Sequence, residues 1–124
     1  MTDRLATTRF GEAWERLFHP AIAHRGLWSP EGPPENSLAA FQAACVAGYG
    51  IELDIQLSAD GEAMVFHDDD LLRMTGAPGR LSDRTTAVLA ELRLKGTDER
   101  IPTLAETLAL VGRRSMVHVE LQTP

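Results

Sequence analysis

The stretch that decides the fold is Ile51-Glu52-Leu53-Asp54-Ile55-Gln56-Leu57, in which apolar and polar residues alternate without a break. A period of two predicts a β-strand with its apolar side chains on one face and its polar side chains on the other. Two acids that are two residues apart on one face lie about 7 Å apart, because each residue rises about 3.3 Å. For an isolated pair of acids a solvated edge strand is the simpler explanation, so the interpretation depends on the rest of the chain.

The composition is typical of one soluble globular domain. The chain has 124 residues, of which 44% are hydrophobic and 24% are charged, and this is enough for a core. The net charge of -6 argues against a nucleic-acid-binding protein, whereas a bound cation could still attract a phosphate. The single cysteine, Cys45, cannot form an internal disulfide, and it fits a cytoplasmic location.

The segments around this strand predict a β/α pattern. Residues 21–26 are expected to form a short buried strand. A helix should begin at residues 35–37, with Asn36 or Ser37 as its N-cap, and run to about Ala47 before Gly48. Together with the strand at 51–57 they make a βαβ unit. Residues 1–19 predict a separate helical cap, and because of their charged side chains no signal peptide is expected there. No apolar run reaches the roughly 20 residues that a membrane span needs.

One hairpin interrupts this pattern. The five residues that follow Leu57 are too few for a parallel crossover, and Asp60-Gly61 is a strong hairpin signal, so residues 63–68 should run back antiparallel. The remaining expectations are a loop over 68–79, a helix over 85–94, a helix that starts at the capping pair Thr103 and Glu106 with Leu104, Leu108 and Val111 in the core, and an alternating strand over 115–122.

Three carboxylates and two histidines gather on the polar side of these strands. Glu52 and Asp54 share one strand, Glu120 lies on the strand at 115–122, and His24 and His67 end two others. An open parallel sheet buries both of its faces under helices, whereas a closed barrel turns one face toward its interior and its mouth. The polar faces therefore favour an α/β barrel.

This set of side chains predicts metal-assisted cleavage of a phosphodiester. Three carboxylates without a neighbouring cation would repel one another, and oxygen ligands suit a hard divalent ion, Mg²⁺ or Ca²⁺. Such an ion polarises a phosphoryl oxygen. His24 and His67 can act as general acid and general base near neutral pH, and the fork of Arg25 suits a phosphate.

The ordered motifs resemble the glycerophosphodiester phosphodiesterase family. They cover roughly residues 20–122, and each is weak alone but specific in this order and spacing. The motifs are His24-Arg25-Gly26, Pro34-Glu35-Asn36, Glu52-Leu53-Asp54, Asp60-Gly61, Val65-Phe66-His67-Asp68, then Leu71, Arg73, Thr75, Ile101-Pro102-Thr103-Leu104 and Val119-Glu120-Leu121.

The resemblance implies a TIM-barrel (β/α)₈ fold of about 250 residues, of which residues 20–124 would be an incomplete domain with about three barrel strands and the hairpin. It implies hydrolysis of glycerophosphodiesters to glycerol 3-phosphate and an alcohol, which is a reaction of lipid metabolism. The activity should need the C-terminal half of the barrel, which residues 20–124 do not include. It also implies a divalent cation on Glu52, Asp54 and Glu120, with His24 and His67 as the acid–base pair. The substrate-binding residues would be Arg25, Glu35 and Gln122, where Gln122 stands in place of the family's usual lysine.

Two alternatives remain open from the sequence. One is a phospholipase D-like enzyme of the same superfamily, which would act on an intact lysophospholipid or sphingolipid. The other is a non-catalytic fragment that associates with a partner carrying the other strands. An open set of barrel strands exposes its edges, so self-association is also expected.

Overall fold

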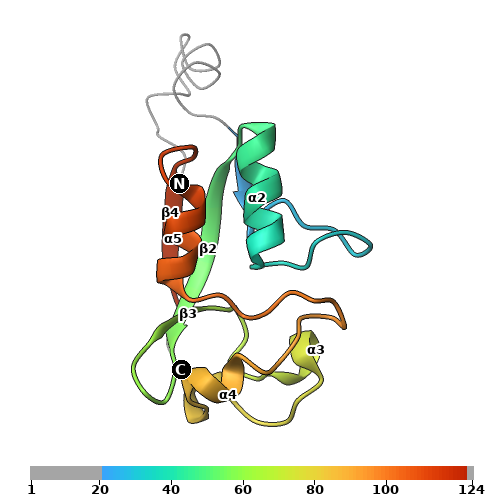
Figure 1. Ribbon diagram of the computed structural model, residues 1–124, viewed down its shortest axis with the longest axis vertical. Helices are drawn as coiled ribbons and strands as arrows, with labels where there is room; N and C mark the ends of the chain where they lie inside the picture. Colours follow the sequence, from blue (N-terminus) through green and yellow to red (C-terminus); the bar gives the residue numbers. More distant parts are fainter. Residues whose placement is uncertain (1–20, 123–124) are drawn as a thin grey trace.

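The sheet is built around one central strand, β2 (Gly50–Leu57). The computed structural model describes residues 21–122, so the predicted cap at residues 1–19 lies outside them. In the described part, β2 pairs in parallel with β1 (Ile22–His24) and β4 (Val117–Leu121), and antiparallel with β3 (Ala63–Val65). Figure 1 shows these strands with two helices on one side and the hairpin region at the end of β2. The predicted parallel strands and the hairpin are confirmed.

The alternation of β2 separates a helix-facing side from a polar side. Ile51, Leu53 and Ile55 are buried in a core with α2 (Leu38–Ala47) and α5 (Leu104–Val111). At about 25 cal/mol per Å² of buried apolar surface, this packing is the main term that holds the helices on the sheet. The polar side chains of β2 therefore point to the opposite face, which no helix between residues 21 and 122 covers.

Both helices begin at the side-chain caps that the sequence suggests. Ser37 Oγ accepts a hydrogen bond from the backbone N–H of Ala40 at 3.1 Å, and α2 ends at Gly48 with φ 80°. At the start of α5, Thr103 Oγ1 accepts from Glu106 N at 3.0 Å and Glu106 Oε1 accepts from Thr103 N at 2.9 Å. The predicted capping box is confirmed, and these caps fix where the chain enters each helix.

The hairpin leads into a second, smaller core. This core lies beyond the C-terminal end of β2 and involves three short elements: α3 (Leu72–Thr75), the 3₁₀ turn η2 (Leu81–Asp83) and α4 (Thr86–Leu89). Its buried residues are Met64, Phe66, Leu71, Met74, Leu81, Leu89, Leu94 and Ile101. The Asp60 carboxylate fastens the hairpin turn to α4, because Oδ1 accepts from Ser58 Oγ at 2.6 Å and from Thr86 N at 2.9 Å.

Three local predictions are wrong. α4 stops at Leu89 instead of reaching residue 94, because Leu89 and Leu94 both enter the second core and a continuous helix would place them on different faces. The loop predicted over 68–79 contains the one-turn helix α3. In α5 Leu108 is exposed and Thr107 is buried in its place, because Thr107 shares one helix face with Leu104 and Val111. The buried hydroxyl of Thr107 is satisfied by donating to Thr103 O at 3.0 Å.

Several apolar side chains of the outer strands are open to solvent. Ile22 on β1 and Val119 and Leu121 on β4 are 43%, 44% and 72% exposed. Val119 and Leu121 are the register partners of Leu53 and Ile55, so they lie on the helix-facing side of the sheet. No helix within residues 21–122 is long and apolar enough to cross a membrane.

Candidate active site

Asp54 is the buried centre of the polar face. It is 2% exposed, and both of its oxygens accept hydrogen bonds from amide side chains. Asn36 Nδ2 donates to Oδ2 at 3.0 Å, and Gln122 Nε2 donates to Oδ1 at 2.8 Å. Arg25 Nε lies 3.5 Å from Oδ2. Four segments of the chain therefore meet at one carboxylate.

The backbone that brings Arg25 and Asn36 to Asp54 is unusual. Arg25 and Asn36 have φ angles of 61° and 54°, in the left-handed region that side chains other than glycine rarely adopt. Asn36 N donates to Arg25 O at 2.8 Å, which joins the two turns. Strained residues of this kind cluster at functional sites. Next in the chain, Gly26 has φ 83° and packs so closely on α2 that an added Cβ would lie 2.8 Å from the Cβ of Ala40.

Strand register places the other two predicted metal ligands near Asp54. Glu120 is its partner on β4, and Glu52 precedes it by two residues on β2. Glu52 is partly buried and Glu120 is exposed. Within residues 21–122, no three histidine, cysteine or carboxylate side chains already surround a common point. The structure thus brings the three carboxylates to one polar face without converging them.

The two predicted catalytic histidines each face a carboxylate. His24 Nε2 lies 3.1 Å from Glu52 Oε1, and its side chain is mostly exposed. His67 Nδ1 lies 2.8 Å from Asp68 Oδ1, and its side chain is 37% exposed. If the proton on Nδ1 points to Asp68, then Nε2 of His67 is left to exchange a proton with a ligand.

Glu35 joins two arginines below the surface. It is 4% exposed, and its carboxylate accepts from Arg25 Nη1 at 3.2 Å and from Arg73 Nη1 and Nη2 at 3.0 and 2.9 Å. Burial alone would raise the pKa of Glu35, but the hydrogen bonds and charge of Arg73 and the charge of Arg25 bring that pKa below its usual value. Glu35 is therefore an anion that holds two guanidinium groups.

Two residues take parts in this site that the sequence analysis missed. Asn36 was expected only as a possible helix cap, whereas Ser37 caps α2 and Asn36 binds Asp54. Arg73 carried no predicted role, and it binds both Glu35 and Asp68. The sequence motifs include both Asn36 and Arg73. Their binding partners lie on other segments of the chain, and the spacing of residues in the sequence does not identify those partners.

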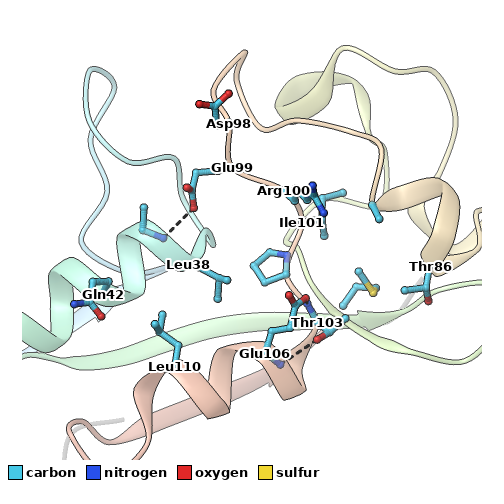
Figure 2. A pocket seen from close by; sticks show the side chains of 14 residues that line it. Leu38, Gln42, Thr86, Asp98, Glu99, Arg100, Ile101, Thr103, Glu106 and Leu110 are labelled. Atoms are coloured by element: carbon cyan, nitrogen blue, oxygen red, sulfur yellow. Dashed lines mark hydrogen bonds between the residues drawn. The ribbon is translucent and has the colours of Figure 1, made fainter.

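A cavity of about 360 Å³ adjoins the Glu35–Arg73 pair and is bordered by Trp28 and Lys95. Its position beside two charged site residues leaves room for part of a ligand. A larger cavity of about 490 Å³ lies elsewhere, and Figure 2 shows it between α2, α5 and the segment from Asp98 to Thr103. Within the described part of the chain, none of the predicted site residues lines this second cavity.

Comparison with known proteins gives a consistent family. The sequence model of the glycerophosphoryl diester phosphodiesterase family matches residues 24–123. The chain is 39% identical over 110 residues to a glycerophosphodiester phosphodiesterase of Caldanaerobacter subterraneus subsp. tengcongensis, a match that covers 82% of this chain and 44% of that protein. It is 43% identical over 98 residues to human glycerophosphodiester phosphodiesterase 1, covering 72% of this chain and 29% of that protein.

Solved structures show the same relationship. A phosphodiesterase of Oleispira antarctica, solved in complex with the product sn-glycerol-3-phosphate, superimposes with a TM-score of 0.75 at 34% identity, covering 83% of this chain and 44% of that one. A glycerophosphodiester phosphodiesterase of Agrobacterium tumefaciens gives 0.77 at 31% identity, covering 84% and 47%. These neighbours are TIM barrels, so the sheet described above corresponds to part of such a barrel. The chain spans less than half the length of the relatives it matches.

Proposed function

Because the chain belongs to the glycerophosphoryl diester phosphodiesterase family, we propose that its site serves the metal-dependent hydrolysis of a glycerophosphodiester to sn-glycerol 3-phosphate and an alcohol. One observation carries the proposal: a carboxylate-bearing face of β2 and β4 lies beside His24 and beside Arg25, whose Nε is 3.5 Å from Asp54 Oδ2. Acids, an imidazole and a guanidinium together supply ligands for a cation, a proton donor or acceptor, and a partner for a phosphate.

The donor set of this face fits a hard divalent cation. Glu52, Asp54 and Glu120 offer only carboxylate oxygens, which Mg²⁺ and Ca²⁺ prefer, and these three residues would hold the ion. When bound, the ion would polarise a phosphoryl oxygen. Of the three, Asp54 is already oriented, because Asn36 and Gln122 hold its two oxygens. Glu52 and Glu120 have the freedom to turn toward the ion.

The two histidines are proposed as the proton-transfer pair. His67 exchanges a proton through Nε2, while Nδ1 stays bonded to Asp68. His24, whose Nε2 lies 3.1 Å from Glu52 Oε1, is the proposed proton donor to the departing alcohol. Arg25 binds the phosphate with the guanidinium N–H groups that do not donate to Glu35, and Gln122 contributes an amide donor instead of a charge.

The test is turnover of glycerophosphocholine by the purified protein, measured as release of sn-glycerol 3-phosphate with added Mg²⁺ or Ca²⁺ and after chelation. We expect Glu52→Gln to remove the dependence on the cation, because an amide is a much weaker ligand than a carboxylate. The matched control is Glu91→Gln, an exposed acid outside the site, which should behave like the wild-type protein. Full, cation-dependent activity in Glu52→Gln would show that the metal assignment is wrong.

We also propose that turnover requires the remainder of the barrel, since the matched region is less than half of each relative. The exposed Val119 and Leu121 on β4 support association of residues 1–124 with a second copy or with a chain that supplies the other strands. Size-exclusion chromatography of the assayed sample tests this. Robust turnover by a monomer of these residues would contradict it.

We also propose a cytoplasmic location, which the free thiol of Cys45 supports.

A further inference from the structure

Arg73 connects two loops that flank the candidate active site. It lies on α3, its side chain is 44% exposed, and its guanidinium group donates to carboxylates from both sides. Toward Glu35 it makes two bonds, Nη1 to Oε1 at 3.0 Å and Nη2 to Oε2 at 2.9 Å. Toward Asp68 it makes two more, Nε to Oδ2 at 2.8 Å and Nη2 to Oδ1 at 3.1 Å. A planar fork that binds two carboxylates fixes the plane of each.

The Asp68 end of this contact reaches His67. Oδ1 of Asp68 is shared between Arg73 Nη2 and His67 Nδ1, while Oδ2 is held by Arg73 Nε. Without the arginine, the Asp68 carboxylate could rotate away from the imidazole. The hydrogen bonds of Arg73 are also the largest reason why the pKa of Asp68 falls to about 2, so this group stays ionised as an acceptor for Nδ1–H.

The Glu35 end reaches the other half of the site. Glu35 also accepts from Arg25, and Arg25 approaches Asp54. One continuous chain of hydrogen bonds and ion pairs therefore runs from His67 through Asp68, Arg73, Glu35 and Arg25 to Asp54. Since Arg73 is the cation between two of these acids, its loss would leave the buried Glu35 with Arg25 alone and Asp68 with the imidazole alone.

From this geometry we propose that Arg73 is a positioning residue: it holds Asp68 so that His67 keeps its proton on Nδ1 and presents Nε2 to the phosphodiester. The proposal rests on the acid–base role proposed for His67. Like the acid that orients the histidine of a hydrolytic triad, Asp68 would select the tautomer, and Arg73 would in turn orient Asp68.

The first test does not depend on turnover. In protein with ¹⁵N-labelled histidine, assigned with a His67→Gln sample, the ¹⁵N shifts of His67 at neutral pH should show a protonated Nδ1 in the wild-type protein. In Arg73→Ala this preference should be lost, so that signals of both tautomers average. The control Arg80→Ala removes the same charge from the same region, where the Arg80 side chain is half exposed and lies 3.9 Å from Asp69, and it should match the wild type. An unchanged His67 tautomer in Arg73→Ala would overturn the proposal.

The second test separates positioning from substrate binding and from folding. We expect Arg73→Ala to lower kcat by roughly 10- to 100-fold with little change in KM, the usual range for a residue that orients a functional side chain. Arg73→Lys keeps the charge but not the fork, so it should recover only part of kcat. If Arg73→Ala does not fold, Arg73→Lys provides the test. A wild-type His67 tautomer and a wild-type kcat in that variant would show that Arg73 has only a structural role. Absence of turnover in the wild-type protein would contradict the proposed function alone, because the tautomer still tests Arg73.

Discussion

Gln122 Nε2 donates a hydrogen bond to Asp54 Oδ1 at 2.8 Å, from the residue that follows β4 to the polar face of β2. The contact spans two parallel strands, and it places a neutral amide where related proteins are expected to have a lysine. A lysine in this place would pair directly with Asp54, whereas the amide satisfies one oxygen and leaves the negative charge available to a cation. The outer strand is thus tied to the centre of the site.

Removing this amide should weaken the fold measurably. In Gln122→Ala the buried oxygen of Asp54 loses a partner, and we expect the free energy of unfolding to fall by about 1–3 kcal/mol. The control is Gln42→Ala, because Gln42 is exposed and its side-chain oxygen accepts a hydrogen bond from the exposed Arg114. Urea denaturation of both variants gives the comparison. Equal stability of the two variants would mean that the Asp54 contact contributes nothing net.

Stability should decline in acid, because Asp68 titrates abnormally. Its pKa is lowered from 3.8 to about 2, first by the hydrogen bonds of Arg73. Between these values the unfolded chain binds more protons than the folded one, so the contribution is full above about pH 4 and is lost as the pH falls toward 2. Asp68→Asn should therefore lose less stability than the wild type over this range.

Asp68 is not the only acid whose pKa is lowered, because Glu35 and Asp60 also titrate below their usual values. Asp60 also has a pKa lowered to about 2, through Ser58 and Thr86, so Asp68→Asn should flatten the curve only in part. Asp69→Asn, at an exposed acid, should leave the slope unchanged. Thermal melts at several pH values between 2 and 6 measure all three proteins, and a slope in Asp68→Asn identical to wild type would contradict the assignment.

Gly26 should tolerate no side chain. An alanine there would have φ near 83° and would place its Cβ 2.8 Å from Ala40 Cβ and 3.0 Å from Phe41 Cδ1. We expect Gly26→Ala to lose about 1–2 kcal/mol from the left-handed backbone and about 1–3 kcal/mol more from overpacking. Gly61→Ala has a similar φ of 84° but open space around its Cβ, so it should lose only the first amount. Equal losses in calorimetry would rule out the steric contribution.

The two threonine caps should differ in strength. Thr103 belongs to a complete capping box with bonds of 2.9 and 3.0 Å, whereas Thr85 Oγ1 accepts from Val88 N at 3.4 Å. We expect Thr103→Ala to lower the free energy of unfolding by about 1 kcal/mol and Thr85→Ala by less. Chemical denaturation of the two variants tests the order, and a larger loss in Thr85→Ala would reverse it.

Periodicity and turn chemistry are local properties of the sequence. They therefore predicted the elements that depend only on residues close together in the chain. The alternation of Ile51 to Leu57 identified β2, and Asp60-Gly61 identified the hairpin, because both signals lie within a few residues. The helix predicted over 85–94 failed because burial of Leu94 in the second core overrides a continuous apolar pattern. Propensity carries no information about such a tertiary contact.

Candidate site residues could be named from the sequence, but their partners could not. Asp54 and Glu120 were placed together by the assumption of a barrel, and the register agrees. The contact of Arg73 with Glu35 joins two irregular loops, whose paths are set by the positive φ of Asn36 and the turn at α3. No pattern of residue types specifies these paths.

The pairing of β2 with its neighbours also bears on the order in which the chain folds. Ile55 meets Val65 across a short hairpin, whereas Ile51 meets Val117 only after a long loop has closed. Closing a longer loop costs more chain entropy before the new contacts can offset that cost. The β2–β3 hairpin should therefore form early, and β4 should pair with β2 late. Glu120 and Gln122 arrive with β4. The carboxylate-bearing face would therefore be completed in the last step of folding, and during refolding the backbone amides of β4 should become protected from deuterium exchange later than those of β2.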